Sequence, residues 1–293
     1  MRRLGFGVLL LALGALALTL FWPDRVMVPT VLQPEQRLDA RLADSSPAPD
    51  PLVAIFPPLT AVVLPQETDG RARIAIVLDD MGPDRAALER ASGLPVAVTF
   101  AFLPYAADVR ELANSARGSG RTVLLHMPME PVGAADPGPG ALLVDQPPGE
   151  QIARLDAALA KFDRLDGLNN HMGSRLTADR DAMDRIMARL AGRGLFFLDS
   201  RTTAETAAAA AAEQAGLPSL SRDVFLDPDG TGAMAEVQLQ RTLEIASATG
   251  TAIAIGHPHR MTLDALERFV ANLDRSQFRL VRLSDLVQIS VAR

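Results

Sequence analysis

Two adjacent carboxylates, Asp79 and Asp80, end an apolar run that begins at Arg73, and Met81-Gly82 follows them. Two anions at the point where a buried strand surfaces are costly unless a cation or a proton lies nearby. The pair therefore predicts a site that holds positive charge. A plain loop cap before the glycine stays open as the alternative.

All four histidines of the chain stand at or just after the end of an apolar run: His126, His171, His257 and His259. A single histidine in such a place is more often structural than a ligand, but four of them favour a common site. One carboxylate and two imidazoles with an open fourth position form the ligand set of a catalytic zinc or similar divalent ion, which lowers the pKa of bound water. A second carboxylate would then serve as general base and another histidine as general acid.

A further carboxylate, Glu130, follows His126 by four residues, a spacing that brings two ligands together if the turn is compact. Pro128 stands between them and disfavours an ordinary helix there. His126 is therefore a stronger ligand candidate than Glu130.

Asp199 ends another apolar run, and Arg201 follows it by two residues. Two uses stay open for Asp199: it steers the acid histidine through a charge-assisted hydrogen bond, or it forms an ion pair with Arg201 at the mouth of the site. Asp223 and Asp227 flank a short alternating run, and a structural use is expected for both. Arg222, just before them, is a candidate substrate contact.

Short β-rich runs alternate with longer helical patterns from residue 73 onward. The expected strands are 73–78, 96–102, 122–126, 167–170, 195–199, 223–227, 251–256 and 278–283. The expected helices are 84–91, 107–117, 149–162, 177–192, 203–215, 233–248 and 262–273. This alternation predicts a parallel sheet covered by helices, and closing the sheet gives a (β/α) barrel or a distorted one. Active sites of such barrels lie at the C-terminal ends of the strands, where the apolar runs of this chain have polar tips.

Three segments of different composition are expected along the chain. Residues 1–22 contain the nineteen uncharged, mostly apolar residues Leu4 to Trp22. At about 1.5 Å per residue this run spans roughly 28 Å, close to a hydrocarbon core, and so predicts an uncleaved membrane anchor. Residues 23–70 are rich in proline and predict an extended linker, and residues 71–293 are long enough for one large domain.

The arginines at positions 2 and 3 place the N-terminus in the cytoplasm by the positive-inside rule. The expectation is a single-pass protein of the inner (cytoplasmic) membrane whose folded domain faces the periplasm. A cleaved signal peptide and a secreted periplasmic protein form the alternative, for which Ala15-Leu16-Ala17 is a weak cleavage match.

Composition narrows the classes of partner. The net charge is −6 and no basic cluster follows Arg3, which argues against nucleic acid. Without cysteine the chain forms no disulfide and no thiolate metal site, so His, Asp or Glu must hold any metal. One Trp and one Tyr leave few aromatic platforms for stacking on sugars.

Seven motifs, in order, resemble those of the divergent polysaccharide deacetylases, relatives of the NodB-type carbohydrate esterases. They are Val77-Leu78-Asp79-Asp80-Met81-Gly82, Val98-Thr99-Phe100, Leu125-His126-Met127-Pro128-Met129-Glu130, Asn170-His171-Met172-Gly173-Ser174, Phe197-Leu198-Asp199-Ser200-Arg201, Arg222-Asp223-Val224-Phe225-Leu226-Asp227 and Ile255-Gly256-His257-Pro258. The match runs through nearly all of 71–293. It implies a deformed (β/α) barrel with a metal-dependent hydrolytic site.

The resemblance also implies roles for single residues. Asp79 takes the place of the base, Asp80 of the metal aspartate, His126 of the first metal histidine and His257 of the acid. The chain departs from the usual His-x-x-x-His pattern, because Glu130 stands where the second metal histidine is expected. His171, in the place of the third usual motif, is expected to supply the missing imidazole.

The sequence thus predicts a hydrolase with a divalent metal ion, zinc by expectation, that removes an acetyl group from an amino sugar of an envelope glycan. Its expected partners are that glycan and, through the N-terminal helix, the membrane, with no nucleic acid. The alternative is a catalytically weakened glycan-binding or envelope-scaffold protein on the same fold.

Overall fold

The structure is a computed structural model, and it describes residues 59–61, 69–287 and 289–291. The expected anchor, Leu4 to Trp22, and most of the expected linker lie outside the described residues, so both stay predictions. Among the residues that are described, no helix combines the length and the apolar character needed to cross a membrane.

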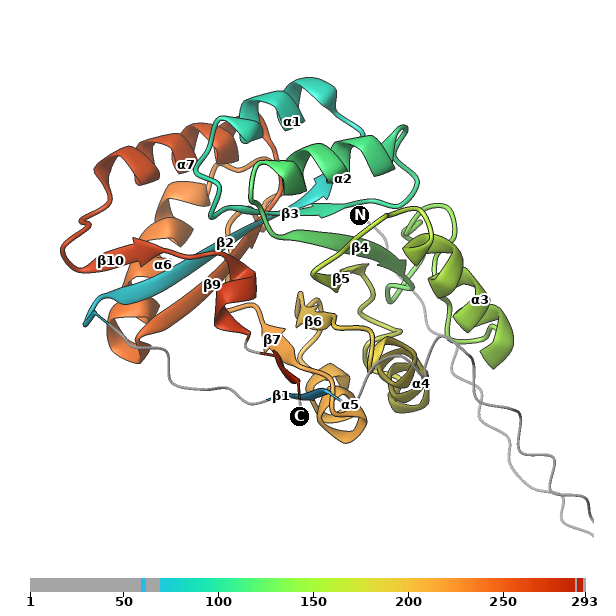
Figure 1. The fold of residues 1–293 in the computed structure, drawn as a ribbon. Helices are drawn as coiled ribbons and strands as arrows, with labels where there is room; N and C mark the ends of the chain where they lie inside the picture. The colour runs from blue at the N-terminus through green and yellow to red at the C-terminus, as the bar shows by residue number, and fades with distance from the viewer. Residues whose placement is uncertain (1–58, 62–68, 288, 292–293) are drawn as a thin grey trace, which may run out of the picture. The chain divides into compact units, whose positions relative to one another are not determined.

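A parallel sheet forms the centre of the fold (Figure 1). Its strands are β2 (Ala72–Met81), β3 (Thr99–Phe102), β4 (Val123–Met129), β5 (Gly167–Met172), β6 (Phe196–Asp199), β7 (Ser219–Ser221), β8 (Val224–Phe225), β9 (Thr251–Gly256) and β10 (Phe278–Leu280). They are ordered β7-β6-β5-β4-β3-β2-β9-β8, and β10 also pairs with β2. All of these pairings are parallel.

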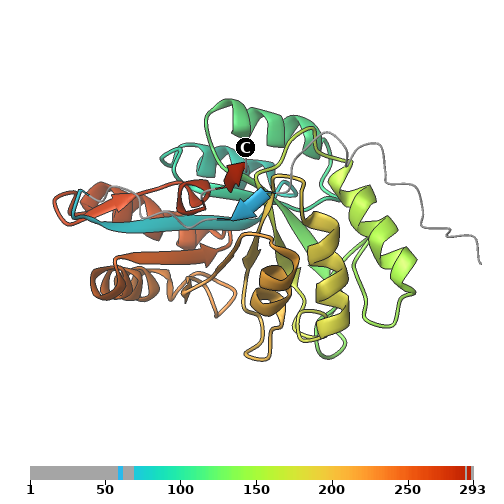
Figure 2. The same cartoon turned by 60° about the horizontal axis from the view of Figure 1, so that its bottom comes forward.

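Among the described residues, seven α-helices follow the strands, and the views in Figures 1 and 2 show them around the outside of the sheet. They are α1 (Arg85–Ser92), α2 (Val109–Gly118), α3 (Pro148–Leu159), α4 (Arg180–Leu190), α5 (Ala208–Ala215), α6 (Ala235–Thr249) and α7 (Arg260–Asn272). A 3-10 helix, Leu283–Leu286, follows β10, and the short strands β1 (Leu59–Ala61) and β11 (Ile289–Val291) pair antiparallel.

Local sequence explains where several helices begin and end. The Asp84 side chain accepts a hydrogen bond from the Ala87 backbone N–H at the start of α1, and Asp179 does the same for Ala182 at the start of α4. Such capping satisfies backbone donors that have no partner inside the helix. α5 consists mostly of alanine, the strongest helix former, and Gly216, with a φ of 64°, caps its C-terminus.

The expected α/β class, with a parallel sheet and outer helices, is confirmed, and each expected strand and helix overlaps one in the structure. The sheet curls but does not close, because β7 and β8 do not pair within the described part of the chain. The result is a curled half-barrel with a seam between these two strands. β7 was not expected from the sequence.

Two apolar clusters lie on opposite faces of the sheet and fix which residues point inward. Ile74, Ile76 and Leu78 pack in the larger cluster with the helices, whereas Ala75 and Val77 belong to a smaller inner cluster. Because side chains alternate along a strand, the residue after Leu78 faces the interior of the curl. The same alternation governs the inward positions of β4, β5, β8 and β9.

Candidate active site and metal centre

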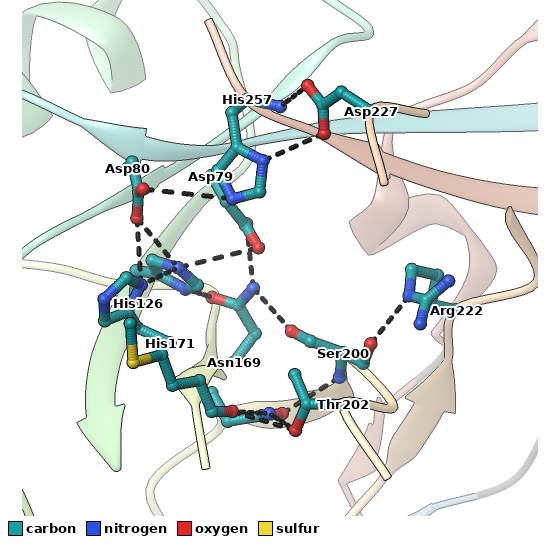
Figure 3. Close-up of polar contacts among 12 residues, drawn as sticks. Asp79, Asp80, His126, Asn169, His171, Ser200, Thr202, Arg222, Asp227 and His257 are labelled. Carbon is teal, nitrogen blue, oxygen red and sulfur yellow. Dashed lines mark hydrogen bonds and ion pairs between the residues drawn. The ribbon is translucent and has the colours of Figure 1, made fainter. Parts of the chain in front are cut away.

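A bulge in β2 explains how two adjacent carboxylates serve one site. In a regular strand Asp79 and Asp80 would point to opposite faces. The pairing of β2 with β3 slips by one residue between Leu78 and Met81, and Asp80 has a φ of 55°. A one-residue bulge re-aims a side chain in this way, and aspartate tolerates the left-handed conformation better than most residues. Both carboxylates therefore reach the same site (Figure 3).

The register of β4 and β5 brings two histidines beside these carboxylates. His126 is the direct partner of Asn169 in the parallel ladder, and His171 follows Asn169 by two residues. A spacing of two keeps His171 on the same face of β5 as Asn169. Since Leu124 belongs to the inner cluster, His126 faces inward as well, and the two imidazole centroids lie 5.0 Å apart.

Three donor atoms converge at the resulting cluster. Asp80 Oδ1 lies 3.0 Å from His171 Nδ1 and 3.3 Å from His126 Nε2, and the two nitrogens are 3.2 Å apart. Ligand atoms about 2.0 Å from a tetrahedral zinc ion are separated by roughly 3.3 Å. Asp80 Oδ1 is buried yet forms no well-oriented hydrogen bond. A buried, uncommitted carboxylate oxygen between two imidazoles fits a divalent cation of the zinc type.

Asn169 fixes the orientation of His126 and of Asp79 at the same time. Its Nδ2 donates to Asp79 Oδ1 at 2.9 Å and to Ser200 Oγ at 3.2 Å, so its Oδ1 is the acceptor for His126 Nδ1 at 2.9 Å. In the neutral ring His126 therefore carries its proton on Nδ1 and directs the lone pair of Nε2 toward Asp80. Second partners of this kind set the tautomer of metal-ligating histidines.

The charges of the cluster attract positive charge to it. Burial would raise the pKa of Asp80, but its contacts with His126 and His171 outweigh burial and hold the pKa well below the usual range. Burial would lower the pKa of His126, but Asp79 and Asp80 raise it. A cation at His126 Nε2, whether a proton or a metal ion, is thus stabilised by two carboxylates.

Asp79 has the environment of a general base. It is 3% exposed, and its Oδ2 lies 3.6 Å from His126 Nε2. Burial raises the pKa of Asp79 above its usual range, although the charges of His126 and His257 and the Asn169 hydrogen bond act in the opposite direction. A carboxylate with a raised pKa is a stronger base than an ordinary one at neutral pH.

His257 directly follows β9, faces the cluster and is held by Asp227. Its Nδ1 is hydrogen-bonded to Asp227 Oδ1 at 2.9 Å, and its backbone N–H donates to Asp227 Oδ2 at 2.7 Å. This leaves Nε2 pointing toward Asp80 Oδ2, 3.9 Å away. Burial would lower the pKa of His257, but the Asp227 hydrogen bond and the charges of Asp79, Asp227 and Asp80 raise it to about 9.

The structure brings together five of the six site residues predicted from the sequence: Asp79, Asp80, His126, His171 and His257. The prediction for Asp199, the sixth residue, is wrong, because Asp199 contacts neither His257 nor the Arg201 guanidinium. Its carboxylate accepts the Arg201 backbone N–H at 2.8 Å and the Thr206 hydroxyl at 2.9 Å. Leu198 belongs to the inner cluster and Phe197 to the outer one, so alternation turns Asp199 toward the helices.

Glu130 and His259 lie outside the cluster. Glu130 forms an ion pair with Arg175 and accepts the Val144 backbone N–H at 2.7 Å. His259 is the residue before α7, and its ring centroid lies 5.7 Å from that of His257. Thus His171, rather than Glu130, stands beside Asp80 and His126.

A second group of donors, Asp227, His257 and His259, is also close enough to hold an ion. Both oxygens of Asp227 are already committed, Oδ1 to His257 Nδ1 and Oδ2 to the His257 N–H and the Thr262 hydroxyl. An ion there would have to displace these hydrogen bonds. The donor set around Asp80 is therefore the better candidate metal centre.

Sequence reasoning did not assign the roles of Asn169 and Asp227. A signal for Asp227 exists in the register of β8 and β9, where partners are separated by 30 residues, Val224 with Ala254 and Phe225 with Ile255. The same separation pairs Asp227 with His257. Asn169 is uncharged, and only its pairing with His126 in the ladder reveals its role.

Comparison with known proteins extends these observations. Uncharacterized protein YibQ of Escherichia coli K12 is 36% identical over 216 residues, which are 73% of this chain and 67% of that protein. An uncharacterized protein of Haemophilus influenzae Rd is 34% identical over 216 residues, covering 74% of this chain and 77% of the relative. The crystal structure of uncharacterized protein ATU2773 from Agrobacterium tumefaciens C58 has a TM-score of 0.72 at 27% identity, covering 78% of this chain and 100% of that one.

The family model described as divergent polysaccharide deacetylase matches residues 76–287, a range that includes the whole candidate site. The two relatives that are more than 30% identical align with about three quarters of this chain, which is close to the extent of the family match. The chain belongs to the divergent polysaccharide deacetylase family.

Proposed function

We propose that the protein is a metal-dependent hydrolase that removes an acetyl group from an amino sugar of an envelope glycan. Membership of the deacetylase family supports a carbohydrate esterase-like role. The observation that carries the proposal is the convergence of three donor atoms, on Asp80, His126 and His171. The buried carboxylate of Asp79 and the hydrogen-bonded imidazole of His257 lie beside these donors.

In this proposal Asp80, His126 and His171 hold a divalent ion of the zinc type. When bound, the ion supplies a Lewis acid for the acyl carbonyl and lowers the pKa of water in the site. Asn169 keeps the lone pair of His126 Nε2 directed at Asp80. The bulge at Asp80 gives that carboxylate the position of a ligand and leaves Asp79 beside it for proton transfer.

Asp79 and His257 carry the two proton transfers. Asp79 accepts a proton from water as the water oxygen forms a bond to the acyl carbon, and its raised pKa suits it to this step. The carbon–nitrogen bond then breaks as His257 donates its Nε2 proton to the leaving amine. Acetate and the free amino sugar result, and exchange with solvent returns His257 to its protonated form and Asp79 to its ionised form.

Asp227 makes His257 an acid rather than a base. Its carboxylate accepts the Nδ1 hydrogen bond and stabilises the imidazolium, so the ring is protonated at neutral pH, with a pKa of about 9. Asp79, a base with a raised pKa, and His257, an acid with a raised pKa, therefore lie on two sides of the cluster. Such a pair matches the two proton transfers of amide hydrolysis.

For location, we propose a single-pass inner-membrane protein anchored by Leu4 to Trp22, with the catalytic domain in the periplasm. The length of that apolar run and the two arginines before it support this arrangement. An uncleaved anchor keeps the full-length chain with membranes after a high-salt wash. A soluble form that begins after residue 17 would show a cleaved signal peptide instead.

The test of function combines metal content with acetate release, measured on the full-length protein and a panel of N-acetylated amino-sugar oligosaccharides. We expect stoichiometric metal and acetate release in the wild type. His257→Ala should keep the metal and lose acetate release, whereas His259→Ala, a matched change beside it, should keep both. Stoichiometric metal without acetate release from any substrate would favour a glycan-binding protein.

A further inference from the structure

Two arginines line a cavity at the seam where the curled sheet does not close. The cavity has a volume of about 550 Å³, and Arg201, Arg222, Asp223 and Ile245 stand among its lining residues, together with the loop 202–204. Arg201 and the loop follow β6, whereas Arg222 and Asp223 connect β7 to β8. The cavity thus lies beside the connection between the two strands that leave the sheet open.

Two chains of contacts connect Arg222, which lines the cavity, to the catalytic cluster. On one side, Arg222 Nε donates to the carbonyl oxygen of Ser200 at 2.6 Å, and Ser200 Oγ accepts from Asn169, the residue that holds Asp79 (Figure 3). On the other side, the Arg222 guanidinium lies 5.0 Å from the centroid of the Phe225 ring, and that ring packs edge to face with His257, with the two ring centroids 5.6 Å apart. One residue therefore separates Arg222 from the acid histidine.

Neither arginine forms an ion pair with a carboxylate in the described part of the chain. Most other arginines of the domain do: Arg90, for example, pairs with Asp264 and Glu267. Arg222 Nε donates to the carbonyl oxygen of Ser200 and Nη2 to that of Arg201. No hydrogen bond between described residues uses Arg222 Nη1. The Arg201 side chain forms no hydrogen bond with any described residue.

Positive charge in the cavity is not neutralised by its own walls. Asp223 is the one carboxylate among the lining residues, and its Oδ2 accepts the Ile253 backbone N–H at 2.8 Å. Among the lining residues, two arginines therefore stand against one aspartate that is already hydrogen-bonded. Burial, and then the neighbouring Arg201 guanidinium, lower the pKa of Arg222 by more than the charges of Asp199, Asp79 and Asp223 raise it.

The backbone holds Arg201 in a conformation that ordinary residues avoid. Its φ is 49°, and the buried Asp199 secures it by accepting the Arg201 N–H through Oδ1 and the Thr206 hydroxyl through Oδ2. Such strain persists where the surroundings enforce it, and it concentrates at ligand-binding sites. Asp199 thus acts on the loop that carries Arg201.

We propose that Arg201 and Arg222 form a subsite for an oxyanion, a carboxylate or a phosphate, carried by the glycan substrate beside the acetylated sugar. The inference rests on the proposed function, because it names the class of glycan that the hydrolase takes. The planar guanidinium fork of Arg201 matches either oxyanion through paired hydrogen bonds, and Arg222 adds its positive charge and its remaining donor, Nη1. Tyr105 is the one tyrosine and Trp22 the one tryptophan of the chain, so charge, rather than stacking on aromatic rings, selects the substrate.

Binding to the full-length protein tests the subsite without requiring turnover. The probes are an N-acetylated amino-sugar disaccharide that carries a carboxylate, its neutral methyl ester, and the analogue that carries a phosphate, with calorimetry as the readout. We expect an acidic probe to bind the wild type at least about tenfold more tightly than the ester, and this preference to fall with added salt. The acidic probe that binds more tightly identifies the oxyanion.

Two variants attribute the preference to the arginines. Arg201→Gln should abolish it, because the Arg201 side chain contributes charge but no hydrogen bond to the fold. Arg164→Gln is the matched control: Arg164 is exposed, lies in the segment before β5 and has the same charge change, so it should keep the preference. Arg222→Lys, which keeps the positive charge but loses the Nη1 donor, should bind the acidic probe with intermediate affinity.

Acetate release from the same probes separates this inference from the proposed function. If Arg201→Gln abolishes selective binding but no probe is deacetylated by the wild type, the subsite stands and the proposed reaction fails. If the wild type deacetylates acidic and neutral probes with equal kcat/KM and binds them equally, the reaction stands and the subsite is overturned. Selective binding that survives Arg201→Gln, or binding of no probe, also overturns it.

Discussion

Asp227 accepts two hydrogen bonds from His257, one from the ring Nδ1 to Oδ1 and one from the backbone N–H to Oδ2, at 2.9 and 2.7 Å. The backbone contact fixes the strand end, and the ring contact fixes the imidazole. Together they hold Nε2 toward the catalytic cluster, where a proton is to be delivered. This relationship makes the charge of Asp227 a determinant of the acid's pKa.

The first prediction concerns the alkaline limb of activity. The pKa of His257 is raised to about 9, so its imidazole is fully protonated below its ordinary pKa of 6.5 and loses its proton as pH rises through about 9. Asp227→Asn removes the carboxylate charge, and the alkaline limb of kcat/KM should move down toward pH 6.5. Asp223→Asn is the control, because Asp223 accepts a backbone N–H four residues earlier without contacting His257. An unmoved limb in Asp227→Asn would refute the acid role of His257.

The second prediction separates the two carboxylates of β2. Asp80→Asn should lose the metal, because Asp80 Oδ1 is one of the three converging donors. Asp79→Asn should keep the metal and lower the rate by about 10²–10⁴, the usual contribution of a general base. Metal content and acetate release are measured on both variants under the same conditions. Full metal and full activity in both would reduce the pair to a loop cap.

The third prediction concerns the third ligand. His171→Ala should weaken metal binding by at least about 100-fold, since a donor of the cluster is removed. Glu130→Gln should leave the metal in place, because Glu130 is held by Arg175 and the Val144 N–H and the amide still accepts the latter. Metal titration against a competing chelator measures both. An empty site in Glu130→Gln together with a full site in His171→Ala would reverse the assignment.

Much of the fold was predictable because apolar runs and helical patterns alternate along the chain. The ends of those runs also located the site, since parallel strands bring their C-terminal ends to one edge. Alternation within the strands predicts still more: Val77 and Ile255 face inward, and so do Asp79 and His257, two residues further on. The same rule turns Asp199 away from the site, as the outward position of Phe197 indicates.

Other features of the site could not be read from residue types. The bulge that brings Asp80 to the side of Asp79 interrupts the alternation on which such a reading depends. Asn169 carries no charge, so its role follows only from its pairing with His126 across two strands 43 residues apart. The seam between β7 and β8 is a property of the whole sheet, and no local pattern marks it.

The fourth prediction concerns Asn169, which links the base to a metal ligand. Asn169→Ala removes the hydrogen-bond partner of two buried atoms, Asp79 Oδ1 and His126 Nδ1. It should lower the free energy of unfolding by about 1–3 kcal/mol. Loss of the hydrogen bond to the ionised Asp79 should also raise the pKa of Asp79, so the acid limb of kcat/KM moves to higher pH.

Asn170→Ala is the matched control for this change. Asn170 is equally buried, but its side chain bonds to the Met172 carbonyl and the Ser200 N–H rather than to the cluster. Thermal unfolding should show a loss in both variants, whereas only Asn169→Ala should move the acid limb. The same displacement in both variants would assign it to a general loss of packing.

The last prediction concerns metal affinity and pH. Burial opposes a charge on His126, but Asp79 and Asp80 raise its pKa, so a proton competes with the metal ion for Nε2. Metal affinity should therefore fall as pH drops through the raised pKa of His126, and Asp79→Asn should move this fall to lower pH, because one of the two carboxylate charges is gone. At higher pH the same variant should bind metal more weakly than the wild type, since the cluster has lost negative charge.

Chelator competition across mildly acidic to mildly alkaline pH, with Asp223→Asn as control, measures both effects. If the profiles of the wild type and Asp79→Asn run parallel at all pH values, protonation of His126 does not govern metal binding, and the coupling between base and metal ligand described here is absent.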